Sequence, residues 1–153
     1  MSDESILEQI QQDMTAAMKT REAATLSTLR MLKAALMEAK TKKAKDAALT
    51  RDEEIEVLQR YAKKRRETIE ELQKIGRADL VAPEECEIAV TRRYLPQMLS
   101  DDEVRAAVRE AVATTGAAGP KDMGKVMGAV MARVKGRADG ATVSRLVKET
   151  LGG

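Results

Sequence analysis

The sequence predicts an all-α protein, and its composition and spacing both support this fold class. Only two of the 153 residues are aromatic, both of them Tyr, so the core must be built from Leu, Ile, Val, Met and Ala. Three prolines and the absence of alternating Val, Thr and Tyr runs argue against a substantial sheet. With 34% charged and 43% hydrophobic residues, the composition is that of a folded domain rather than a disordered segment.

Two helices are expected in the first forty residues. Ser5 and Glu8 have the spacing of a capping box, so a helix begins there and continues to about Thr20. A second helix is expected where apolar residues recur at helical spacing: Leu26, Leu29, Leu32, Leu36 and Ala39. It fades into the basic run Thr41–Lys45, which indicates either a phosphate contact or, more typically, a solvated helix end.

The third helix is expected to be long. Thr50 and Glu53 form another capping-box pair, and an apolar stripe continues over about Arg51–Ile75. The basic run 63–66 within it indicates either an RNA contact or a surface neutralised by glutamates of the same helix. We favour neutralisation, because glutamates follow the run at four-residue spacing.

The fourth helix leads to the predicted domain boundary. Pro83 either lies in its first turn or kinks it. Pro96 ends this helix, and Ser100 opens the next one with a third capping box. We therefore expect an N-terminal helical domain over residues 1–97 and a three-helix tail domain over residues 98–153.

The tail carries the clearest helical patterns. Its first helix has the apolar positions Val104, Val108, Ala111 and Val112. Its second has the apolar positions Met123, Val126, Met127, Val130, Met131 and Val134. A stripe of small residues runs beside these positions, and from it we predict a close helix crossing at Gly124 and Gly128 and a left-handed turn at Gly136. Asp139 is expected to cap the last helix.

Several segments together carry a family resemblance. They are 128–131, 135–139 and 143–147 in the tail, and 26–30, 76–80 and 94–96 upstream. On these segments the chain resembles the GatB/YqeY family, whose tail domain ends the B subunit of glutamine-dependent tRNA amidotransferases and the small stand-alone YqeY proteins. Segments 122–124 and 138–140 are more similar to the stand-alone form.

The resemblance implies partners rather than chemistry. In the amidotransferases the tail helps to hold the tRNA near its elbow. The implied partners are therefore tRNA and the proteins of amidotransferase or aminoacyl-tRNA synthesis. The family label is carbon–nitrogen ligase with glutamine as amido-N-donor, but glutamine hydrolysis belongs to a separate subunit and the kinase-like step to another domain.

The residues themselves offer no active site. The chain has no histidine, which removes histidine-based nucleophile triads and histidine-ligated zinc. Its single cysteine, Cys86, forms neither a thiolate metal site nor a disulfide by itself, and there is no phosphate-binding Gly-rich loop. We expect no catalysis by this chain alone, no cofactor and no metal. One cysteine and no long apolar stretch predict a cytoplasmic protein with no membrane segment.

Charge points to one candidate surface. Residues 121–153 hold seven basic and three acidic side chains, whereas residues 1–100 hold eighteen of each. The predicted RNA-binding residues are the basic side chains of the tail: Lys121, Lys125, Arg133, Lys135, Arg137, Arg145 and Lys148. We expect the turn at Lys135–Arg137 to lie at the centre of the contact. The alternative is a helical protein-interaction or scaffold module without RNA binding.

Overall fold

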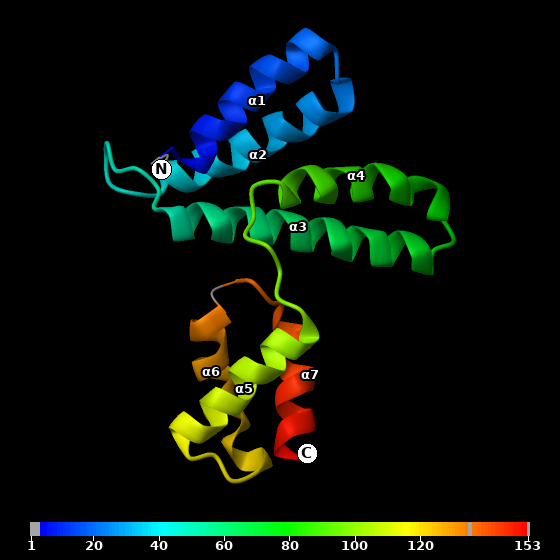
Figure 1. Ribbon diagram of the computed structural model, residues 1–153. Helices are drawn as coiled ribbons and strands as arrows, with labels where there is room; N and C mark the ends of the chain where they lie inside the picture. The colour runs from blue at the N-terminus through cyan, green and yellow to red at the C-terminus, as the bar shows by residue number, and fades with distance from the viewer. Residues whose placement is uncertain (1–3, 135, 153) are drawn as a thin grey trace. The chain divides into compact units, whose positions relative to one another are not determined.

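The computed structural model describes residues 4–134 and 136–152, and all regular structure in these ranges is helical (Figure 1). Helices account for 78% of the described residues, among which there is no strand, and this confirms the predicted fold class. The α-helices are α1 (Ile6–Thr20), α2 (Ala23–Thr41), α3 (Arg51–Lys74), α4 (Val81–Arg92), α5 (Asp101–Thr115), α6 (Met123–Val134) and α7 (Gly140–Leu151). Two short 3-10 helices are η1 (Ala78–Leu80) and η2 (Pro120–Asp122).

The contacts between residues divide the chain into two units, Met1–Leu95 and Pro96–Gly153. We call them unit 1 and unit 2. Each unit has its own apolar core, and each is described here by itself.

Unit 1 consists of two helix pairs. Helix α1 packs beside α2, α3 packs beside α4, and α2 contacts both α3 and α4 (Figure 1). The leucine stripe of α2 lies at the centre of the core, where Leu29, Leu32 and Leu36 are fully buried. The side chains packed with them are Ile6, Ile10, Ala17, Val57, Leu58, Val90 and Tyr94.

The three predicted capping boxes are present. Ser5, Thr50 and Ser100 each accept a hydrogen bond from the backbone N–H three residues on, and the glutamate at that position bonds back to the cap. Because these bonds satisfy N–H groups that have no partner within the helix, the starts of α1, α3 and α5 follow directly from the local sequence. Pro83 lies in the first turn of α4, where a proline needs no hydrogen-bonding N–H.

Helix α1 has a second cap, which comes from α3. The carboxylate of Glu54 accepts hydrogen bonds from the backbone N–H groups of Ile6 and Leu7, at 3.2 and 2.9 Å. Glu54 is only 2% exposed. A buried carboxylate at a helix N-terminus is stabilised by these N–H groups and by the helix dipole. This bond fixes where α1 lies on α3.

Unit 2 is built from α5, α6 and α7, which all pack against one another (Figure 1). Its core is dominated by valine, and its buried side chains are Val104, Val108, Ala111, Val126, Val130, Val134, Ala138, Val143, Leu146 and Val147. Gly136, with a φ of 79°, has the left-handed backbone expected after α6, and Asp139 caps α7 by accepting the N–H of Thr142 at 2.7 Å. Over the described ranges, none of the helices combines the length and apolar character that crossing a membrane requires.

The predicted close helix crossing at Gly124 and Gly128 is wrong. Both glycines are exposed, and a Cβ atom placed on either would meet nothing within 4 Å. The buried positions of α6 are Val126, Val130 and Val134, so the valine stripe faces the core and the glycine stripe faces outward. Met131 also differs from the prediction, because it is 37% exposed.

Candidate nucleic-acid interface

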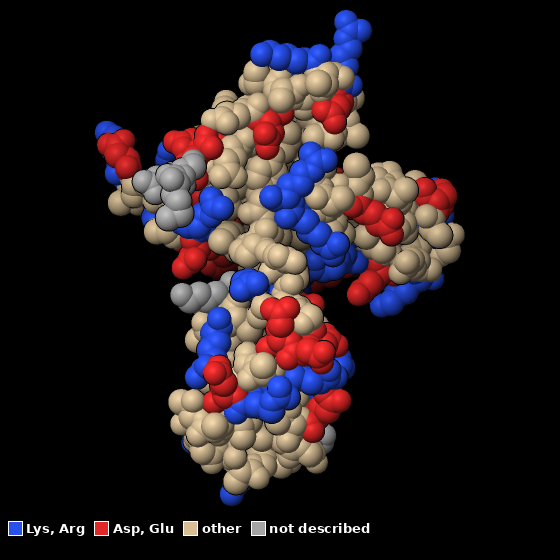
Figure 2. Space-filling model, viewed as in Figure 1, with Lys and Arg blue, Asp and Glu red and all other residues tan. Residues whose placement is uncertain are grey.

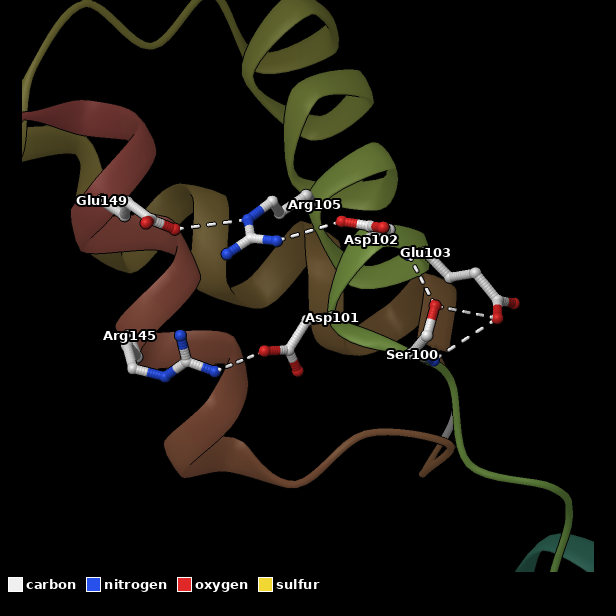
Figure 3. Close-up of polar contacts among 7 residues, drawn as sticks. All are labelled: Ser100, Asp101, Asp102, Glu103, Arg105, Arg145 and Glu149. Atoms are coloured by element: carbon white, nitrogen blue, oxygen red, sulfur yellow. Dashed lines mark hydrogen bonds and ion pairs between the residues drawn. The ribbon is translucent and has the colours of Figure 1, made fainter.

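The first turn of α5 is tied to α7 by ion pairs (Figure 3). The carboxylate of Asp101 lies 2.9 Å from the guanidinium of Arg145 on α7. Arg105 joins Asp102, one turn away at 3.0 Å, to Glu149 on α7 at 3.4 Å. The nearby carboxylate of Glu149 raises the pKa of Arg105 above its ordinary value. These three carboxylates therefore form ion pairs with arginines of the same unit.

The remaining acidic side chains of unit 2 are also engaged. Glu103 completes the capping box of Ser100. Glu110 pairs with Arg133 at 2.5 Å. Asp122 accepts the backbone N–H of Ala118 at 3.0 Å, and Asp139 caps α7. All seven Asp and Glu side chains of residues 96–153 thus have a partner within the unit.

The basic side chains predicted to contact RNA fall into three groups. Arg133 and Arg145 are held in the ion pairs above. Lys121, Lys125 and Lys148 are exposed, and among the described residues no carboxylate lies within 4.0 Å of them. Lys135 lies outside the described residues. The structure adds Arg109, which is exposed and equally without a carboxylate partner in the described ranges. Charge counting missed Arg109 because residues 101–120 hold two basic and four acidic side chains.

Arg137 has a structural role that the sequence did not predict. Its Nε donates to the backbone carbonyl of Gln97 at 3.0 Å, and its own carbonyl accepts the N–H of Leu99 at 2.7 Å. These bonds tie the turn before α7 to the segment before α5. The side chain of Arg137 therefore bonds within unit 2, although it remains exposed, and its contact with RNA stays a prediction.

The outer face of α6 combines positive charge with a surface free of side chains. Helix η2, which contains Lys121, runs directly into α6, which contains Lys125, Gly124 and Gly128. The two glycines, four residues apart, share one side of α6. Because the glycines have no Cβ, a partner can approach the α6 backbone closely beside the two lysines. We call this surface the α6 face.

A shallow hollow lies over the exposed side of α7. Its lining residues are Ala141, Ser144, Arg145, Lys148 and Glu149. Arg145 and Glu149 are paired with α5, so Lys148 is the lining residue whose charge is unpaired in the described structure. The hollow is thus weakly positive.

The basic run 63–66 of unit 1 is neutralised differently from the prediction. Arg65 lies between Glu84 and Glu87 of α4, at 3.4 and 3.6 Å, and its guanidinium lies 5.3 Å from the ring centre of Tyr61. The Tyr61 hydroxyl donates to Glu87 at 2.9 Å. The other three members of the run are exposed, without a carboxylate within 4.0 Å in the described ranges. The glutamates that neutralise the run therefore belong to α4, and they pair with Arg65.

The short basic run after α2 is also partly engaged. Lys43 donates to the backbone carbonyl of Ala48 at 3.0 Å and to Glu53 at 2.6 Å. The hydrogen bond from Lys43 lowers the pKa of Glu53 below its ordinary value. This lysine thus closes the loop between α2 and α3.

Metal-binding clusters and reactive side chains are sparse in the described structure. No cluster of three or more His, Cys, Asp or Glu side chains in the described ranges has an arrangement that would hold a metal ion. Cys86 is a free, exposed thiol. In unit 2 the acidic side chains have partners within the unit, whereas Arg109, Lys121, Lys125 and Lys148 are exposed without a carboxylate within 4.0 Å in the described ranges.

The described structure is that of an all-helical protein whose second unit is a small three-helix bundle. The chain belongs to the family of YqeY-like proteins, whose family model matches residues 7–151. A search of curated proteins found no match.

Proposed function

We propose that this protein is a non-catalytic accessory protein that binds structured RNA, and tRNA in particular, through unit 2. One observation carries the proposal. Every acidic side chain of unit 2 has an internal partner, whereas Arg109, Lys121, Lys125 and Lys148 are exposed without a carboxylate partner in the described structure. Unit 2 therefore offers a partner four exposed, unpaired cations, which suit the phosphates of a nucleic acid.

The absence of aromatic side chains from unit 2 favours folded RNA over single-stranded RNA as the partner. Proteins that read single strands stack bases on aromatic rings. Both tyrosines belong to unit 1, where the hydroxyl of Tyr61 bonds to Glu87 and that of Tyr94 to Asp13. Helical RNA is recognised through phosphates, 2′-hydroxyls and groove shape, for which Lys and Arg are sufficient. A folded RNA such as tRNA is the better match.

The α6 face supports a backbone contact. Lysines act as flexible point charges, and a glycine surface beside them removes the steric barrier to a ribose–phosphate chain. The amidotransferase resemblance of the tail adds tRNA, and proteins of aminoacyl-tRNA synthesis, as the partners to test first. Amide transfer itself is assigned to no residue of this chain.

The proposal is tested by titrating bulk tRNA into the full chain in a gel-shift assay at one low salt concentration. K121Q/K125Q removes two unpaired charges from the α6 face, and we expect it to bind tRNA more weakly than wild type. The matched control is K42Q/R60Q, which removes two cations paired with Glu38 and Glu56 at 3.8 and 3.9 Å on unit 1. Equal weakening by both variants would contradict a specific role for the α6 face.

A second function, protein–protein interaction, is favoured by the turn between α3 and α4. Ile75 is 70% exposed and Leu80 is 42% exposed, on either side of a turn fixed by a two-bond pair between Arg77 and Asp79. Exposed apolar side chains on a fixed turn are typical of a contact with another protein. If the wild-type chain fails to shift tRNA even at low salt, this second function replaces the first.

A further inference from the structure

Two segments of unit 1 without any acidic residue pack against each other. Residues 23–37, most of α2, contain Arg30 and Lys33 and no Asp or Glu. Residues 88–95, the second half of α4 and its end, contain Arg92 and Arg93 and again no Asp or Glu. Helices α2 and α4 are in contact, and the leucine stripe of α2 shares one core with the apolar side chains of the second segment. Four cations are therefore carried by two packed segments that contribute no negative charge.

The four cations lie at the surface without acidic partners. Arg30, Arg92 and Arg93 are exposed and Lys33 is half-buried. Within the described ranges no carboxylate lies within 4.0 Å of any of them. Figure 2 shows Lys and Arg gathered over the C-terminal half of α4 and its neighbouring helices.

The acidic residue that the core brings to this region is already engaged. Asp13 of α1 accepts a hydrogen bond from the Tyr94 hydroxyl, directly after the two arginines of α4. Asp13 is thus hydrogen-bonded to Tyr94, and in the described ranges it forms no ion pair within 4.0 Å with any of the four cations.

A purely structural role explains only half of the set. Arg92 and Arg93 lie at the C-terminus of α4, where cations offset the helix dipole. Arg30 and Lys33 lie in the middle of α2, far from either end of that helix. Neither the dipole nor an ion pair within the described ranges accounts for them, and the helix that carries them packs against α4.

We infer that Arg30, Lys33, Arg92 and Arg93 form a second phosphate-binding surface, on unit 1, for the same RNA that unit 2 contacts. The inference rests on the proposed function for its choice of partner but on different residues for its evidence. RNA is favoured over an acidic protein because three of the four cations are arginines, whose planar forks match phosphate oxygens. A chain with phosphate contacts on both units would bind its RNA at two places.

The test uses the full-length chain and bulk tRNA over a series of salt concentrations. The patch variant is R30Q/R92Q. The matched control is K19Q/K74Q, which removes two exposed lysines from the last turns of α1 and α3, outside the two acid-free segments. For the patch variant we expect weaker binding and a log–log salt slope reduced by about one to two, since each lost phosphate contact removes about one released ion. The control should bind like wild type.

The outcomes separate this inference from the proposed function. If K121Q/K125Q weakens binding while R30Q/R92Q binds like its control, unit 1 makes no phosphate contact and the inference is wrong, although the function of unit 2 stands. If R30Q/R92Q weakens binding while K121Q/K125Q does not, the unit 1 surface stands and the α6 face is rejected. If wild type binds no tRNA at low salt, both are wrong.

Two further measurements test whether the patch variant misfolds and whether the patch binds lipid instead of RNA. Circular dichroism must show the same melting for R30Q/R92Q as for wild type. If it does not, R30Q alone, in the middle of α2, should still reduce the salt slope by about one. Flotation with phosphatidylserine vesicles tests the alternative of an acidic membrane surface. Loss of vesicle binding with tRNA binding intact would overturn the assignment to RNA.

Discussion

At the scale of single residues, two glutamates of unit 1 differ in how well their carboxylates are hydrogen-bonded: Glu54 is buried and Glu84 is half-buried. Glu54 satisfies two backbone N–H groups at the start of α1 and joins α1 to α3. Glu84 lies beside Arg65, but its Oε2 atom and the Nε of Arg65 are buried without a hydrogen-bond partner in the described structure. The first carboxylate is well satisfied, whereas the second is partly desolvated without full compensation.

We predict that Glu54→Ala destabilises the protein by roughly 2–4 kcal/mol, because it leaves the N–H groups of Ile6 and Leu7 buried and unpaired. Urea unfolding followed by circular dichroism measures the effect. Glu56→Ala is the control, since its exposed pair with Arg60 at 3.9 Å contributes less than about 1 kcal/mol. Equal effects from both substitutions would show that Glu54 does not hold α1 on α3.

The second residue-scale prediction concerns pH. Burial raises the pKa of Glu84 above its ordinary value of 4.5, with Arg65 opposing the shift. The folded state therefore binds this proton more tightly than the unfolded chain. The resulting stabilisation is fully present below pH 4.5 and is lost as the pH rises through the raised pKa of the folded state.

Glu84→Gln removes this titration, so its melting temperature relative to wild type should increase between pH 4 and pH 7. Melting curves at the two pH values measure the difference. Glu85→Gln, at an exposed position of the same helix, controls for the loss of one charge. A relative melting temperature of Glu84→Gln that falls with rising pH would contradict the assignment.

At the scale of elements, α6 has a buried valine face and an exposed glycine face. Glycine is unfavourable in a helix by roughly 1 kcal/mol relative to alanine. Since no neighbouring atom occupies the space beside Gly124 or Gly128 in the described structure, internal packing does not explain the glycines. The proposed approach of an RNA backbone to α6 would explain them.

We predict that Gly128→Ala stabilises the protein by about 0.5–1 kcal/mol, because a Cβ there meets open space and the helix gains propensity. Gly136→Ala should instead destabilise it, because the φ of 79° is strained for alanine. Thermal unfolding distinguishes the two signs. A loss of stability in Gly128→Ala would restore the close helix crossing that the structure contradicts.

The α6 face also makes a prediction for binding. Gly128→Leu places a bulky side chain beside Lys125 without touching the core, so we expect near-wild-type melting and weaker tRNA binding. Melting curves and a gel shift on the same preparation measure both properties. Unchanged tRNA affinity with intact folding would show that RNA does not approach α6 at this position.

The elements also show which features sequence alone could predict. The helix starts at Ser5, Thr50 and Ser100 were predicted because their signals lie within four residues. The cap from Glu54 was not, because its partners lie 47 and 48 residues away. Glycines at four-residue spacing indicate either a packed crossing or an exposed face, and only the fold decides between them.

The same distinction applies to the candidate site. Charge counting identified the basic character of the tail, including its exposed lysines. It could not show that Arg133 and Arg145 are neutralised by Glu110 and Asp101, since these partners come from α5. The bond from Arg137 to a backbone carbonyl likewise joins residues forty positions apart.

At the scale of the whole molecule, each unit has its own core. We predict that a fragment of residues 96–153 folds by itself, because its buried valines contact one another and its acidic side chains find their partners within the unit. A helical circular dichroism spectrum with a cooperative melting transition would support this. A fragment that is unfolded at room temperature and lacks a transition would show that unit 2 depends on unit 1.

The central claim is that the positive charge left unpaired on unit 2 binds RNA. The most direct measurement is the salt dependence of tRNA affinity for the full chain and for K121Q/K125Q, plotted as log affinity against log salt concentration. The account predicts a negative slope for wild type and a slope shallower by about one to two for the variant. Identical slopes for the two proteins, or no binding by either at low salt, would contradict it.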